Sequence, residues 1–142
     1  MHFGMTGTQR GVTSKQLSAA VRELSVMQQA GFEWMHNGDC IGADKQIGLL
    51  WQVHHEGLLW GHPPDIDSKR AYLRFDRCEN AHPYLKRNRR IVDASRVLLV
   101  FPGEMKEIDR SGTWATYRYA KRVDINRTII YPDGSIVRET ST

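Results

Sequence analysis

The sequence predicts an α/β fold in which helices cover both faces of a mostly parallel sheet and a hairpin lies at the C-terminal end. Three observations lead to this fold class. First, short apolar runs alternate with segments of helical periodicity along the chain. Second, residues 97–101 read Val-Leu-Leu-Val-Phe, and such a run is typical of a parallel strand buried on both faces. Third, Pro132-Asp133-Gly134 is a turn signal between two short strand-like runs.

The first half of the chain contains three predicted strands and two predicted helices. In chain order they are strand, helix, strand, helix and strand, over residues 2–6, 13–31, 32–36, 39–57 and 58–61. The first helix has the clearest signals, because Thr13 and Gln16 have the spacing of a capping box and Gly31 provides a stop. Asp39 is a suitable cap for the second helix, and Gly57 ends it.

The second half of the chain begins with an irregular segment. Residues 64–83 are polar and charged, with scattered aromatic residues and no clear period. Because such a stretch is unusual in a compact domain, we expect a lid or wall over a site, with one short helical turn; a mobile surface loop is the alternative. The elements that follow are helix, strand, loop, helix, strand and strand, over residues 84–94, 96–101, 102–110, 111–122, 126–131 and 135–138.

The composition indicates one ordinary globular domain, residues 1–142. The formal net charge of +4 suits an anionic ligand. No apolar run approaches the ~20 residues that span a bilayer, and no signal-peptide pattern is present, so we expect a cytoplasmic protein without a membrane partner. Cys40 and Cys78 belong to no C-x-x-C pair, and no H-x-x-x-H spacing occurs, so neither a disulfide framework, a metal nor a cofactor is expected.

Three short segments place glycine and small polar residues where a strand ends and a helix begins. They are Met5–Arg10, His36–Asp44 and Ser111–Trp114. The carboxyl ends of parallel strands meet at one edge of a sheet, and ligands bind there where the strand order reverses. A helix N-terminus attracts anions, because its first N–H groups lack partners and the helix dipole is positive there. The three segments therefore predict one pocket for a phosphate or a ribose.

In their order and spacing, these segments resemble the motifs of the SLOG superfamily, which unites the Smf/DprA proteins with the LOG proteins. The resemblance is carried by Gly4–Arg10, His36–Asp44, Arg87-Asn88 and Ser111–Trp114, and it spans roughly residues 2–131. It looks closest to the small stand-alone members of bacteria and phages. The resemblance implies a Rossmann-like fold, a pocket for nucleotides or nucleotide-derived signals, and a homo-oligomer.

One departure from the family pattern concerns catalysis. LOG enzymes cleave the N-glycosidic bond of nucleoside 5′-monophosphates with an arginine and with a glutamate in a P-G-G-x-G-T-x-x-E pattern. Arg87 matches the arginine, but here Pro102-Gly103 is followed by an insertion, and Thr116 stands where the glutamate belongs. Threonine cannot act as a carboxylate base. The resemblance thus implies binding without the usual catalytic carboxylate, unless Glu104 or Glu107 of the insertion replaces it.

The candidate ligand-binding residues come from all of these motifs. They are Gly7, Thr8, Arg10, Gly38, Asp39, Asp44, Arg87, Ser111, Gly112, Thr113 and Trp114. The glycines would allow close approach of the backbone, and Arg10 and Arg87 would bind phosphate. Asp39 would bind a ribose hydroxyl or cap a helix, and Trp114 would stack on a base or belong to the core.

Three functions are compatible with these features. The first is binding of a nucleotide or nucleotide-derived signal (NAD- or ADP-ribose-derived, or a cyclic nucleotide) by a sensor or a sequestering protein, as in phage counter-defence. The second is hydrolysis of a nucleotide with Asp39, Asp44, Glu104 or Glu107 as the carboxylate. The third is binding of single-stranded nucleic acid through the basic Lys86–Arg90 cluster.

Overall fold

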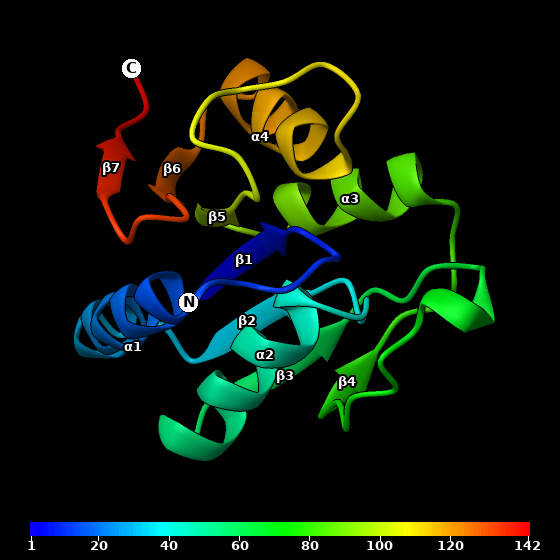
Figure 1. Ribbon diagram of the computed structural model, residues 1–142. Coiled ribbons are helices and arrows are strands. Elements are labelled where there is room, and N and C mark those ends of the chain that lie inside the picture. Colours follow the sequence, from blue (N-terminus) through cyan, green and yellow to red (C-terminus); the bar gives the residue numbers. More distant parts are fainter.

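The computed structural model describes residues 1–142 and contains one seven-stranded sheet in the order β4-β3-β2-β1-β5-β6-β7 (Figure 1). The strands are β1 (His2–Gly7), β2 (Trp34–Asn37), β3 (Leu58–Gly61), β4 (Arg77–Cys78), β5 (Val97–Phe101), β6 (Asn126–Ile130) and β7 (Ile136–Glu139). All neighbouring strands are parallel except β6 and β7, which form an antiparallel hairpin. The predicted fold class is therefore confirmed.

The strand order reverses between β1 and β5. The chain starts in the middle of the sheet at β1, moves outward through β2, β3 and β4, and then crosses to β5 on the other side of β1. In open α/β sheets, ligands bind at this kind of switch point, beyond the carboxyl ends of the strands.

Two helices cover each face of the sheet (Figure 1). The helices α1 (Ser14–Gln29) and α2 (Ala43–Leu49), the latter continued by a π-helical turn η1 (Leu50–His54), pack on one face. The helices α3 (Tyr84–Asp93) and α4 (Gly112–Arg122) lie on the other face, over β1, β5 and β6. None of the helices combines the length and the hydropathy that a membrane span requires.

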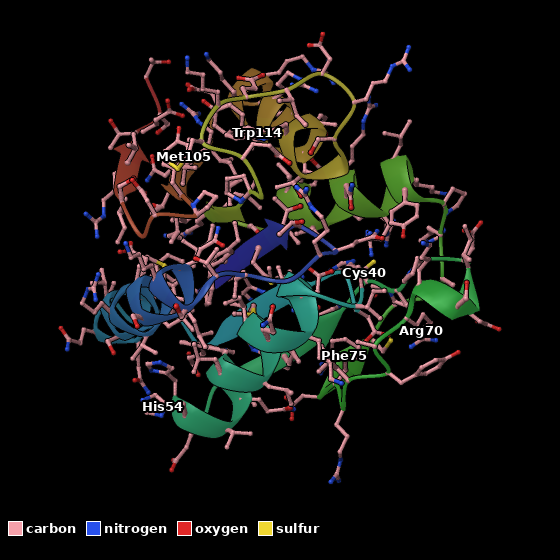
Figure 2. All side chains as sticks on the ribbon, in the orientation of Figure 1. Cys40, His54, Arg70, Phe75, Met105 and Trp114 are labelled. Carbon is pink, nitrogen blue, oxygen red and sulfur yellow. The ribbon has the colours of Figure 1, made fainter.

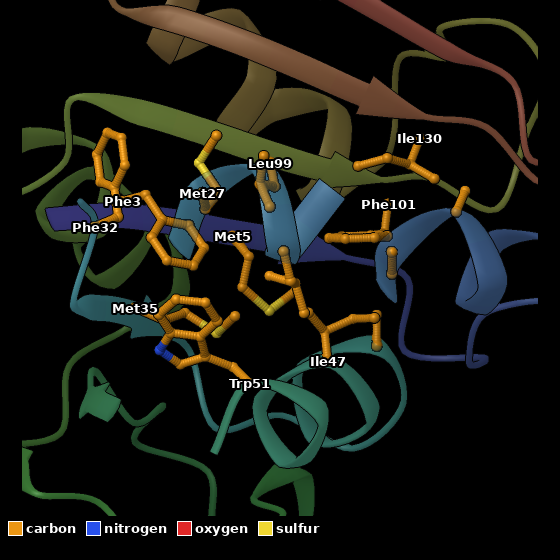
Figure 3. Close-up of a cluster of buried hydrophobic side chains, with 14 of the residues drawn as sticks. Phe3, Met5, Met27, Phe32, Met35, Ile47, Trp51, Leu99, Phe101 and Ile130 are labelled. Atoms are coloured by element: carbon orange, nitrogen blue, oxygen red, sulfur yellow. The ribbon is translucent and has the colours of Figure 1, made fainter. Parts of the chain in front are cut away.

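The larger core lies between the sheet and the α1–α2 layer. Figure 3 shows Phe3 and Met5 of β1 pointing toward Trp51 of η1, and the rings of Phe3 and Trp51 meet edge to face at 5.0 Å between centroids. A smaller core on the other face packs Ile91 of α3 and Trp114 of α4 against β5 and β6. Burial of apolar side chains on both faces explains why β5 has no polar residue.

Two predicted helix caps are confirmed. Thr13 Oγ1 accepts the Gln16 N–H at 3.0 Å, and the Gln16 side chain accepts the Thr13 N–H at 3.1 Å, which completes the capping box of α1. Ser111 caps α4, because its hydroxyl oxygen accepts the Trp114 N–H at 3.2 Å. Both caps orient residues that lie beside the β1 and β5 ends of the sheet.

The prediction that Asp39 caps α2 is wrong. The N-cap position of α2 is Gly42, at φ 90°, and it makes no side-chain capping bond. Asp39 lies in the left-handed region at φ 56°, and its carboxylate accepts hydrogen bonds from Arg70 Nε at 2.8 Å and from Leu73 N at 2.9 Å. The carboxylate is therefore turned toward the segment 64–83, away from the helix.

The segment 64–83 extends the sheet edge. It contains a short 3₁₀ turn η2 (Asp67–Lys69), as predicted, and also β4, which pairs with β3. The expected lid or wall over a site is not what the structure shows, because no residue of this segment lines the cavity at the switch point. Its hydrogen bonds to Asp39 and its pairing with β3 hold this segment at the β3 edge of the sheet.

Three histidines form a hydrogen-bonded chain on the α3 side of the β1–β2–β3 region. His2 Nδ1 lies 2.8 Å from His36 Nε2, and His36 Nδ1 lies 2.7 Å from His62 Nε2. Trp60 stacks on His36 with ring centroids 5.3 Å apart. Burial lowers the pKa of His36 to about 3 and the pKa of His62 to about 4, so both imidazoles are neutral at physiological pH.

Candidate functional site

A cavity of about 380 Å³ lies at the switch point, beyond the ends of β1, β2 and β5. Nine of the eleven predicted site residues line it: Gly7, Thr8, Arg10, Gly38, Asp44, Arg87, Ser111, Gly112 and Thr113. The three glycine-bearing turns, which are distant in the sequence, therefore converge on one cavity. This convergence follows from the parallel alignment of β1, β2 and β5, because each turn leaves the sheet at the same edge.

The N-terminus of α4 supplies backbone donors to the cavity. The N–H groups of Gly112 and Thr113 have no hydrogen-bond partner in the protein, whereas the next N–H, of Trp114, is satisfied by Ser111. Arg110 also lines the cavity. Two free N–H groups, the positive end of the helix dipole and a guanidinium make this wall suitable for an anion.

The turn after β1 is fixed by main-chain hydrogen bonds. Thr8 N donates to Phe101 O at 3.0 Å, and Thr8 O accepts the Ala43 N–H at 2.9 Å, so this turn joins β5 to the start of α2. Gly7 lies against Ala43 so closely that a side chain at Gly7 would overlap it. The glycine therefore has a packing role in addition to forming part of the cavity wall.

Arg87 is buried and holds the inner wall together. Its Nη1 donates to the carbonyl oxygens of Gly38 and of His62, the latter at 3.1 Å. Its Nη2 lies 3.5 Å from Cys40 Sγ, and its Nε donates to Asn88 Oδ1 at 2.6 Å. Of the five guanidinium N–H groups, these contacts leave one without a partner. Arg87 thus joins α3 to the turns after β2 and β3, and it presents little of its hydrogen-bonding capacity to the cavity.

Asp44 is the buried acid of the cavity. Only 6% of its surface is exposed, and its Oδ2 accepts the Cys40 N–H at 3.1 Å. Its second carboxylate oxygen has no hydrogen-bond partner in the protein, and no cation lies within ion-pair distance of it. Burial raises the pKa of Asp44 to about 6, although the charge of Arg87 and the Cys40 N–H act in the opposite direction.

Polar contacts at the rim connect segments that are remote in the sequence. The guanidinium of Arg10 forms an ion pair with Glu104, whose other oxygen accepts the Trp114 Nε1–H at 3.0 Å. Gln9 Nε2 donates to the Tyr84 hydroxyl at 2.8 Å. Tyr84 and Gln9 were not among the predicted site residues. Gln9 lies within the first glycine-bearing segment, Met5–Arg10, and that position is a local signal, whereas nothing local marks Tyr84.

Two predicted site residues do not line the cavity. Asp39 is fully buried and bonded to Arg70 and Leu73. Trp114 is 1% exposed, and its ring meets Tyr117 edge to face at 5.5 Å between centroids. Figure 2 shows Trp114 on α4, well separated from Cys40. The Trp114 and Tyr117 rings therefore belong to the α4 core, and the indole offers no open face to a base.

Thr116 stands at the position of the missing glutamate, and it also does not line the cavity. Its hydroxyl is buried and donates to Gly112 O at 2.8 Å, within α4. The carboxylates that do line the cavity are Asp44 and Glu104, which come from α2 and from the insertion after β5. Two carboxylates therefore line the cavity, and neither comes from the position of Thr116.

No protein-family model matches the chain, and no curated protein is significantly similar to it in sequence. Several solved structures are similar in fold, including two that cover most of this chain. One is TM1055, a structural-genomics target, with 15% identity, a TM-score of 0.62, and coverage of 89% of this chain and 71% of TM1055. The other is the molybdenum cofactor carrier protein MCP from Chlamydomonas reinhardtii, with 16% identity, a TM-score of 0.60, and coverage of 90% and 74%. At these identities the similarity shows a Rossmann-like fold and no more.

Proposed function

We propose that this protein binds a nucleotide or a nucleotide-derived signal in the switch-point cavity, as a sensor or a sequestering protein of the SLOG type. One observation carries the proposal: the two unpartnered N–H groups of Gly112 and Thr113 open into the same cavity as the turns after β1 and β2. A phosphate is the ligand group that such a helix N-terminus favours. A carrier role is also known for the fold, since one neighbour is named as a cofactor carrier.

The size of the cavity limits the ligand. At about 380 Å³ it is near the lower end of the roughly 300–1,000 Å³ range of small-molecule sites. A mononucleotide or a cyclic mononucleotide matches this volume better than an intact dinucleotide. A signal derived from NAD would therefore enter with its phosphoribose part, while the remainder extends toward the open rim.

Hydrolysis of the ligand is the second candidate function. It is favoured by Asp44, because a buried carboxyl with a pKa of about 6 can exchange a proton near neutral pH. Against it stands the loss of the glutamate that the LOG pattern requires, since Thr116 is bonded within α4. A protein that sequesters a signal during phage counter-defence has to bind the signal and does not have to cleave it.

A third candidate, binding of single-stranded nucleic acid, has support at a different place. The guanidinium groups of Arg89 and Arg122 both lie over the Tyr119 ring, at 5.0 and 5.3 Å from its centroid. This cluster lines a second groove, between α3 and α4, and none of its three residues lines the switch-point cavity. Binding there would weaken steeply with salt and would be independent of substitutions in the cavity.

A pair of variants at Gly112 tests the proposed function. A side chain at Gly112 meets no atom within 4 Å, so both Gly112→Asp and Gly112→Ala can fold. The aspartate places a negative charge at the anion site, and it is compatible with a helix N-terminus. We expect Gly112→Asp to weaken binding of the best ligand in a nucleotide panel by more than tenfold in isothermal titration calorimetry, and Gly112→Ala to bind like the wild type. Equal affinity of the aspartate variant would refute the proposal.

The same panel separates binding from turnover. After incubation, the protein is denatured and the nucleotides are separated by chromatography. Recovery of intact ligand supports a binding protein. Release of a free base or of phosphate, lost on Asp44→Asn, would instead establish the hydrolase.

A further inference from the structure

The carboxylate of Asp44 accepts fewer hydrogen bonds than is usual for a deeply buried carboxylate. A carboxylate can accept about four hydrogen bonds, and the protein supplies one, from Cys40 N. Arg87 is close by, but its Nη1 is directed to the carbonyl oxygens of Gly38 and His62. Buried charged groups are normally hydrogen-bonded or paired, so the remaining acceptor capacity of Asp44 faces the cavity that it lines.

Neither capping of α2 nor its helix dipole explains why Asp44 is buried at this position. The N-cap of α2 is Gly42, and Asp44 is two residues farther into the helix. A carboxylate in the first turn interacts favourably with the helix dipole from an exposed position as well, without loss of hydration. Here the side chain is 94% buried, since 6% is exposed, and burial disfavours its charged form. The position is therefore unfavourable unless the cavity supplies hydrogen-bond donors.

The cavity has two chemically different ends. At one end, Gly112 N, Thr113 N and Arg110 offer donors and positive charge, and the nearby carboxylate of Glu104 is already bonded to Arg10 and Trp114. At the other end, Asp44 offers acceptors and, when ionised, negative charge. A phosphate is attracted to the first end, whereas at the second end it would meet a carboxylate whose charge is offset only by Arg87, a guanidinium already bonded to main-chain carbonyl oxygens. A hydroxyl group fits the second end, because it donates a hydrogen bond to a carboxylate and carries no charge.

We propose that Asp44 binds the ribose hydroxyls of the ligand, so that the site selects ribonucleotides over analogues that lack these hydroxyls. This inference rests on the proposed function, because it places the phosphate at the N-terminus of α4. It assigns to Asp44 the role that the sequence suggests for Asp39, whose carboxylate is occupied by Arg70 and Leu73. A site built to hydrogen-bond a hydroxyl rejects an analogue without it strongly, because a buried polar group is then left unpaired.

The experiment compares two sets of ligands with two proteins. The ligands are the four common ribonucleoside 5′-monophosphates, their 2′,3′-dideoxy counterparts, and inorganic phosphate. The proteins are the wild type and Asp44→Asn, whose amide oxygen can still accept the Cys40 N–H. For a ribonucleotide that binds, we expect at least tenfold weaker binding of its dideoxy counterpart to the wild type, measured by calorimetry. In Asp44→Asn the ratio should fall below threefold, while inorganic phosphate binds no more weakly than to the wild type.

A matched control and a pH series distinguish this role of Asp44 from a general effect of removing a negative charge. Asp109→Asn changes an acid of the neighbouring insertion that does not line the cavity, and it should keep the wild-type ratio. In the wild type, the ratio should be larger at pH 7.5 than at pH 5, because an ionised carboxylate is the stronger acceptor. This second measurement needs no variant, and it remains decisive if Asp44→Asn folds poorly.

The outcomes distinguish the two proposals. Equal binding of ribo- and dideoxynucleotides, or an Asp44→Asn variant with the wild-type ratio, overturns the role of Asp44 and leaves the nucleotide site standing. Binding of inorganic phosphate without any nucleotide also overturns it. If neither phosphate nor any nucleotide binds, the proposed function itself fails.

Discussion

The guanidinium of Arg87, on α3, donates a hydrogen bond to the carbonyl oxygen of Gly38, in the turn after β2. A Cβ atom on Gly38 would lie 2.5 Å from Arg87 Nη1 and 2.8 Å from Asp44 Oδ2. The absence of a side chain at Gly38 thus allows the arginine and the acid to approach the same turn. The sequence predicts that this glycine lets the backbone come close to a ligand. The structure adds that it lets Arg87 come close to the backbone.

Removal of Arg87 should destabilise the protein. Arg87→Met would leave the carbonyl oxygens of Gly38 and His62 without their donor, and it would remove the positive charge near Asp44. Loss of a buried charged partner typically costs about 3–5 kcal/mol, so we expect a decrease of about 3 kcal/mol in the free energy of unfolding by urea. Arg89→Met, at an exposed position of the same helix, is the control and should cost less than about 1 kcal/mol. A similar loss in both variants would contradict the structural role of Arg87.

The glycines at positions 7 and 112 should respond oppositely to alanine. Gly7→Ala introduces a methyl group that overlaps Ala43 and crowds Phe101, so it should destabilise by about 1–3 kcal/mol, the usual cost of overpacking. Gly112→Ala meets no neighbour and replaces glycine in the first turn of α4, so it should be neutral or stabilising by up to about 1 kcal/mol. Thermal unfolding of both variants checks the contrast. Equal melting temperatures would mean that Gly7 does not pack tightly against Ala43.

The ion pair between Arg10 and Glu104 should affect the ligand more than the fold. Arg10 is largely exposed, so the pair should contribute less than about 1 kcal/mol to stability. Glu104→Gln removes a negative charge from the cavity rim and releases Arg10, so anion binding should become tighter by a factor of two to ten. Calorimetric titration with the best nucleotide measures this change. Weaker binding in the variant would indicate that Glu104 itself contacts the ligand.

The pH dependence of stability should contain two opposing contributions. The pKa values of His36 and His62 fall from 6.5 to about 3 and about 4 on folding, so the unfolded chain binds more protons below pH 6.5. Each histidine therefore removes about 1.4 kcal/mol of stability per pH unit as the pH falls from 6 to 4. The pKa of Asp44 rises from 3.8 to about 6, so the folded state binds its proton first and gains a similar amount over the same interval.

Two variants separate these contributions in urea unfolding at pH 6, 5 and 4. His36→Gln should reduce the slope of stability against pH by about 1.4 kcal/mol per unit, because one of the two histidine contributions is lost. Asp44→Asn should steepen the slope by about the same amount, because the opposing contribution is lost. Parallel curves for all three proteins would show that neither group titrates as its burial implies.

Local patterns in the sequence predict most elements of this fold, with β4 as the missed strand. Strand and helix periodicities are local properties, as are the capping box at Thr13, the Ser111 cap and the turn at Pro132. The glycine turns could be assigned to one cavity because parallel strands place their carboxyl ends at a single edge. Nine of the predicted site residues line that cavity, although Arg87 reaches it from α3 and Ser111, Gly112 and Thr113 from the start of α4.

The role of each side chain depends on contacts that form only in the folded molecule. Asp39 and Asp44 both belong to the segment after β2, but Arg70 and Leu73, more than 30 residues after Asp39, occupy the first carboxylate and leave the second one facing the cavity. The irregular segment 64–83 forms a sheet edge because part of it pairs with β3. Trp114 is a core residue because α4 packs on β5 and β6. A side chain's partners depend on chain segments that no local pattern contains, and hydrogen bonding and burial are settled only when those segments meet.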